Sequence, residues 1–210
     1  MVDISKTLMD VVSFIGLIPT LIAILTFQRH NRTQRRLAWL VWGSTVISLT
    51  AFVLAAVFHR PNLFLLHILT IFELIFLTLI YQDYLPRKMD RIIIVVFSLG
   101  ALFNSIVVEQ FASMNVPARS MEALIIIVYA LLFFSTTLRQ MEIKHLERIP
   151  LFWISSGGLI YYSGSFLIFL FSVNIRDFGE LWFGYWGLHA LFNILLNLIY
   201  AVALWVKPTR

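Results

Sequence analysis

Two sets of polar side chains interrupt otherwise apolar sequence at helical spacing. His67, Thr70 and Glu73 follow one another at intervals of three residues, and His189 and Asn193 lie four residues apart. Each spacing places its side chains on one face of an α-helix. An imidazole next to a carboxylate can gain or lose a proton near neutral pH, and ionisable side chains at membrane depth are candidates for function. We therefore expect these two helical faces to bind a small ligand or a proton.

Other polar residues of the apolar sequence extend this candidate site. The complete set of predicted ligand-binding or proton-sensing residues is His67, Thr70, Glu73, Asn104, Glu109, Glu122, Tyr161, Tyr162, His189 and Asn193. Glu73 has no polar neighbour in the sequence Ile71–Ile75, so His67 and His189 are the partners that we consider for it. Asparagine and histidine side chains also hydrogen-bond between membrane helices as purely structural contacts, and the sequence leaves both roles open.

The elements that must position these residues are seven apolar runs that fill most of the chain. The runs cover residues 9–27, 37–58, 63–81, 92–109, 121–138, 151–173 and 181–206. A hydrocarbon core about 30 Å thick requires roughly 20 apolar residues of helix. The 210 residues are 60% hydrophobic and only 13% charged, and the mean hydropathy is +0.88. The sequence therefore predicts an all-α integral membrane protein whose single domain, over residues 1–210, is a bundle of seven transmembrane helices.

Basic residues are distributed unequally between the connections of these helices. Twelve of the 16 Lys and Arg residues lie in alternate connections and in the C-terminal tail, whereas the opposite side carries Lys6, Arg60, Arg119 and Arg176. An excess of Lys and Arg marks the cytoplasmic side of a membrane protein, so we expect the N-terminus outside and the C-terminus in the cytoplasm. The predicted pocket then opens to the outside. Basic residues that set the orientation in the membrane account for the net charge of +5. We therefore expect no nucleic acid partner.

Proline and glycine modify two of the predicted helices. Pro19 lies inside the first run and is expected to kink it, because proline removes one backbone hydrogen bond. Gly157, Gly158 and Gly164 are expected to let a neighbouring helix approach closely. The first run lacks the basic start and the small-residue cleavage site of a signal peptide, so we expect it to remain as a membrane helix.

Several kinds of chemistry lack the residues that they require. The chain has no cysteine, and its last predicted helix has no lysine before Lys207 that would hold retinal. His67 and His189 lack the closely spaced second histidine typical of zinc-dependent membrane hydrolases. A zinc site would need both histidines together with Glu73, Glu109 or Glu122. We therefore expect a protein with no catalytic activity and no cofactor.

Four segments of the chain are similar to a known membrane module. They are Leu66–Glu73, Pro150–Ser156, Tyr161–Gly164 and His189–Asn197. In these segments the chain resembles the seven-transmembrane input module of bacterial sensor histidine kinases. The resemblance implies a protein of the bacterial inner (cytoplasmic) membrane that perceives a signal. Because these 210 residues contain no kinase domain, it also implies a separate histidine kinase or other signalling partner at the cytoplasmic face.

The sequence thus favours a non-catalytic sensor or receptor-like module that binds its ligand within the lipid bilayer and signals through a separate partner. A small transporter or channel is the first alternative, and it requires a polar path that continues to the cytoplasmic side. A metal-dependent membrane lipid hydrolase is the second alternative. A structural assembly factor without a ligand also remains open, and each of these readings is compatible with a homo-oligomer.

Overall fold

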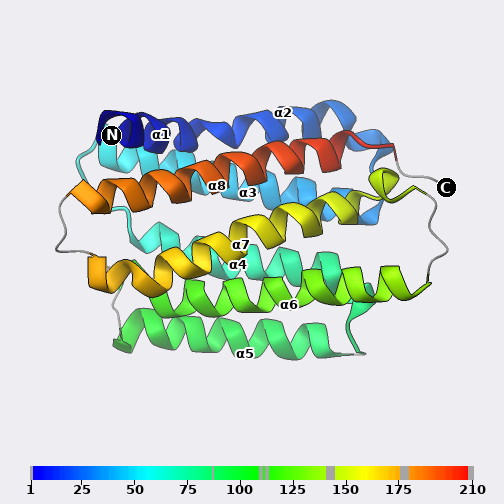
Figure 1. The fold of residues 1–210 in the computed structure, drawn as a ribbon. Helices are drawn as coiled ribbons and strands as arrows, with labels where there is room; N and C mark the ends of the chain where they lie inside the picture. Colours follow the sequence, from blue (N-terminus) through cyan, green and yellow to red (C-terminus); the bar gives the residue numbers. More distant parts are fainter. Residues whose placement is uncertain are drawn as a thin grey trace.

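The computed structural model describes residues 2–86, 88–108, 111, 114–140, 145–175 and 180–207. Long helices run side by side along one axis, and the start of α1 and the end of α8 lie at opposite ends of the bundle (Figure 1). The described residues contain no β-strand. The helical elements are α1 (Val2–Ile15), α2 (Leu17–Thr26), η1 (Phe27–Arg29), α3 (Arg32–Ala56), α4 (Phe64–Tyr81), η2 (Gln82–Tyr84), α5 (Met89–Phe103), the π-helical turn η3 (Asn104–Val108), α6 (Val116–Gln140), η4 (Leu146–Arg148), α7 (Pro150–Ile175) and α8 (Glu180–Trp205).

In the part of the chain that the structure describes, seven helical stretches are long and apolar enough to span a membrane. They are Val11–Arg29, Arg32–Ala56, Phe64–Tyr84, Met89–Val108, Val116–Arg139, Pro150–Phe171 and Phe183–Trp205. Each overlaps one of the runs predicted from the sequence, so the all-helical fold with seven apolar helices is confirmed. Such a fold is consistent with an integral membrane protein, whereas the direction of insertion stays a prediction.

The first stretch consists of two helices. The interruption between α1 and α2 falls at Gly16, three residues before the kink that was predicted at Pro19. Proline has no backbone N–H to donate to the carbonyl four residues earlier, so the carbonyl of Ile15 loses its helical partner there. A Cβ atom at Gly16 would lie 2.7 Å from the Thr45 Oγ1 atom of α3. The junction is therefore also a point of close contact between the first two spans.

The packing of the helices places α8 between the two halves of the chain. α8 contacts α7 on one side and α1 and α2 on the other, while α4 contacts α3, α5 and α6. α5 lies at the edge of the bundle, next to α4 (Figure 1). Residues of α3, α4, α6, α7 and α8 can therefore face a common interior.

Small residues allow two of these helices to approach closely. A Cβ atom at Gly157 of α7 would lie 2.9 Å from Ile199 Cγ2 of α8, and one at Gly164 would overlap the ring of Phe192. Gly158 has more space, since its nearest neighbour would be Ile126 Cγ2 at 3.8 Å. The predicted role of glycine in close packing is confirmed at Gly157 and Gly164.

Buried polar side chains fix the C-terminal end of the bundle. The Gln34 amide donates hydrogen bonds to the carbonyls of Ala203 (2.9 Å) and Val206 (2.8 Å). His30 Nε2 lies 2.7 Å from Thr26 Oγ1 and 3.2 Å from the Leu204 carbonyl oxygen. Burial lowers the pKa of His30, because desolvation penalises the charged imidazolium. These contacts hold the end of α8 against the start of α3.

Candidate functional site

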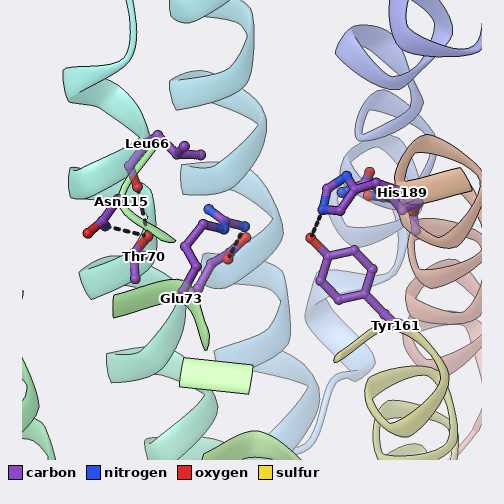
Figure 2. A network of polar contacts seen from close by, with 9 residues as sticks. Leu66, Thr70, Glu73, Asn115, Tyr161 and His189 are labelled. Atoms are coloured by element: carbon purple, nitrogen blue, oxygen red, sulfur yellow. Dashed lines mark hydrogen bonds and ion pairs between the residues drawn. The ribbon is translucent and has the colours of Figure 1, made fainter. Parts of the chain in front are cut away.

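The polar face predicted on α4 is paired with the π-helical turn η3 and with the residue just before α6. His67 is buried, and its Nδ1 atom lies 2.6 Å from Ser105 Oγ in the π-helical turn. One turn further, the Asn115 amide donates to Thr70 Oγ1 at 3.2 Å, and Thr70 in turn donates to the Leu66 carbonyl at 2.8 Å (Figure 2). The predicted common face of His67, Thr70 and Glu73 is therefore confirmed by its contacts.

Glu73 pairs with Arg119, a basic residue whose position in the sequence indicates a topology signal. Arg119 Nη2 lies 3.7 Å from Glu73 Oε2, and the two side chains are only 5% and 17% exposed. The expectation that His67 or His189 is the partner of Glu73 is wrong, because each histidine has a different partner. Arg119 is the fourth residue of α6 and points into the bundle, so it lies in the interior and not in a connection.

Glu122 is the third ionisable side chain of a buried cluster that also contains Glu73 and Arg119. It is 1% exposed, and its carboxyl group interacts with the carboxyl group of Glu73 and with the guanidinium of Arg119. Arg119 and Glu122 are three residues apart in α6, which places both on the face that meets α4. The Arg119 guanidinium also lies 5.4 Å from the centre of the Phe169 ring. The spacing of Arg119 and Glu122 was a signal in the sequence for a shared charged face of this helix, but it does not identify Glu73 of α4 as the partner of that face.

A second polar group lies on α7 and α8. Tyr161 Oη is 3.4 Å from His189 Nε2, and the rings of Phe169 and Trp186 lie 5.4 and 5.5 Å from the imidazole. Figure 2 shows this pair on the opposite side of the view from Glu73 and Thr70. Asn193, one turn after His189, accepts a hydrogen bond from the Asn197 amide at 2.9 Å.

A cavity of about 200 Å³ lies between these two groups. Its walls come from α1, α3, α4, α6, α7 and α8. The polar residues that line it are Ser13, Ser44, Thr45, Ser48, Glu73, Arg119, Tyr161, Tyr162, His189, Asn193, Asn197 and Tyr200. A cavity with this lining can hold a small molecule that carries hydrogen-bonding groups.

The cavity gathers five of the ten predicted site residues. They are Glu73, Tyr161, Tyr162, His189 and Asn193. Glu122 contacts the cluster behind Glu73 without lining the cavity. His67, Thr70 and Asn104 belong to the neighbouring hydrogen-bond network instead, in which the Asn104 amide donates to Asn115 Oδ1 at 2.9 Å. Glu109 lies outside the described residues.

Asn115 is the other important residue that the sequence analysis missed. It is fully buried immediately before α6, and its φ angle of 56° lies in the left-handed region. Asparagine adopts this conformation more readily than most residues because its short side chain can hydrogen-bond locally. Asn115 thereby joins α4, the π-helical turn and the start of α6, next to the charged cluster.

Within the part of the chain that the structure describes, no three His, Asp or Glu side chains lie close enough to hold a metal ion. Fold and site together define the class as an all-helical protein of seven apolar helices around a polar cavity. No protein-family model, curated protein or solved structure matches the chain. The particular function must therefore be argued from the site.

Proposed function

We propose that the protein is a sensor or receptor-like module of the bacterial inner membrane, without catalytic activity of its own. In this proposal a small ligand or a proton enters the cavity from the outside and binds beside Glu73. The bound state is passed to a separate signalling partner, such as a histidine kinase, at the cytoplasmic face.

The observation that carries the proposal is the buried cluster of Arg119, Glu73 and Glu122 beside the cavity. A buried ion pair is expensive to desolvate, and replacing one by apolar residues is often neutral or stabilising. Stability alone is therefore a weak reason for such a cluster, whereas ionisable groups at membrane depth are commonly functional. The adjacent cavity gives these charges access to a ligand.

The contacts around the cavity suggest how binding would move helices. α4 and α6 supply the charged wall, and α7 and α8 supply the wall with Tyr161 and His189. A ligand that binds both walls would favour one spacing of the two helix pairs. Such a shift occurs only to the extent that the ligand binds the two states with different affinity.

A transporter or channel would require a polar path from the cavity to the other end of the bundle. Towards the C-terminal end of α4, polar side chains bond to one another: Tyr81 Oη lies 2.9 Å from Ser155 Oγ, and Thr78 Oγ1 lies 3.2 Å from Tyr129 Oη. Satisfied pairs of this kind are typical of packing contacts between membrane helices. This arrangement favours a sensor over a transporter.

The proposal is tested by screening small polar molecules against the full chain in lipid nanodiscs, with thermal unfolding as the readout. A ligand at 100 times its Kd should stabilise the protein by about 2.7 kcal/mol. Glu73→Gln should abolish this stabilisation, whereas Glu147→Gln, a change at an exposed carboxylate, should retain it. A ligand that stabilises the protein and Glu73→Gln equally would remove Glu73 from the site. Uptake of the ligand into proteoliposomes without any partner would contradict a sensor and favour the transporter.

A further inference from the structure

The charges of the buried cluster do not balance when both carboxyl groups are ionised. Glu73 and Glu122 would contribute two negative charges, and Arg119 contributes one positive charge. Glu73 Oε2 and Glu122 Oε1 are shielded from solvent and have no hydrogen-bond donor, and two of the guanidinium nitrogens, Nε and Nη1, have no acceptor. A buried charge without a counterion is strongly unfavourable, so the cluster requires one more positive charge.

The other titratable groups that face the cluster do not supply this charge. They are Tyr161 and Tyr162 on α7 and His189 and Tyr200 on α8. Tyrosine is neutral or negative and never a cation. His189 is buried near Arg119, whose positive charge disfavours a second cation on the imidazole, and its Nε2 faces the Tyr161 hydroxyl. Among the described residues, Arg119 is thus the sole cation that faces the two carboxyl groups.

We infer that Glu73 and Glu122 bind a single proton between them, and that this proton is the exchangeable ligand of the site. Glu122 donates its carboxyl O–H to the Glu73 carboxylate, and Arg119 balances the remaining negative charge. Glu73 lines the cavity and Glu122 does not, so the proton leaves through Glu73 to solvent in the cavity. Release leaves two carboxylates beside one guanidinium. The inference rests on the proposed function, in which it identifies the ligand as a proton.

Infrared spectroscopy of the full chain in nanodiscs tests this inference. Protein labelled with ¹³C in the side-chain carboxyl of glutamate separates glutamate bands from aspartate bands. At about pH 7 an exposed glutamate is ionised, so a protonated glutamate band should come from the buried pair alone. The band should disappear as pH rises, and it should be absent from Glu122→Gln and from Glu73→Gln. Glu147→Gln should leave it unchanged.

Three outcomes would overturn the inference. The first is the absence of a protonated glutamate band from the unmodified protein at about pH 7. The second is a band that persists in Glu122→Gln or in Glu73→Gln. The third is a band that sodium ions remove at constant pH, since the site would then hold a metal cation in place of the proton. If one variant fails to fold, the unmodified protein and the other variant still show whether the two glutamates share a proton. A proton band without any effect on a signalling partner would contradict the proposed function and leave this inference intact.

Discussion

Arg119 shows how a single residue can be misread when only its position in the sequence is known. It lies just before the fifth predicted run, where a basic residue is normally a topology signal. The structure extends α6 back to Val116 and turns Arg119 towards Glu73. The sequence did predict Glu73 as an unusual carboxylate, because no local partner was present. Its true partner was not predictable, since residues 46 positions apart meet only through packing of α4 on α6.

Removal of Arg119 should be far more costly than removal of another arginine from the same predicted side. Arg119→Gln leaves an uncompensated buried carboxylate and should lower the free energy of unfolding by about 3–5 kcal/mol. Arg60→Gln changes an exposed side chain and should cost less than about 0.5 kcal/mol. Detergent-induced unfolding in mixed micelles measures both. The combined variant Glu73→Gln/Arg119→Gln should lose less than the sum of its two single changes. Strict additivity would show that the pair is not coupled.

At the scale of the helix, periodicity predicted faces but not the neighbours that cover them. The three-residue spacing on α4 correctly indicated one polar face. The covering residues come from the π-helical turn at Ser105 and from Asn115 before α6. Neither site carries a periodic signal, because a π-turn inserts one residue into the helical repeat and Asn115 lies outside any helix. In contrast, Gly157 correctly predicted a close contact between helices, because few residues other than glycine fit where two helix backbones approach each other.

Two adjacent glycines of α7 should respond differently to the same substitution. Gly157→Ala brings a methyl group to 2.9 Å from Ile199 Cγ2 and 3.2 Å from Ile199 Cβ. Ile199 is branched at Cβ and moves with difficulty, so overpacking should cost about 1–3 kcal/mol. Gly158→Ala meets its nearest neighbour at an ordinary 3.8 Å and should be neutral or stabilising. Equal losses of unfolding free energy in the two variants would show that α7 and α8 are not closely packed at Gly157.

For the molecule as a whole, hydropathy predicted the seven long apolar helices, because a bilayer core about 30 Å thick requires roughly 20 apolar residues of helix. The order in which the helices pack carried no comparable signal. Contact of α1 and α2 with α8 closes the bundle, whereas α5 remains at its edge (Figure 1). The cavity depends on this arrangement, since its lining combines the first and the last helices. The sequence therefore predicted a polar interior of the bundle, but not which helices line the cavity.

The orientation of the bundle decides which solvent reaches the cavity, and it can be measured with single cysteines because the chain has none of its own. Pro61 and Gln28 are both exposed, lie at opposite ends of the bundle and carry no charge, so Pro61→Cys and Gln28→Cys preserve the charge distribution. If the excess of Lys and Arg sets the topology, a membrane-impermeant maleimide should label Pro61→Cys in intact cells and Gln28→Cys only after permeabilisation. The reverse pattern would place the basic connections outside. The cavity would then open towards the cytoplasm, and the direction of signalling proposed here would be wrong.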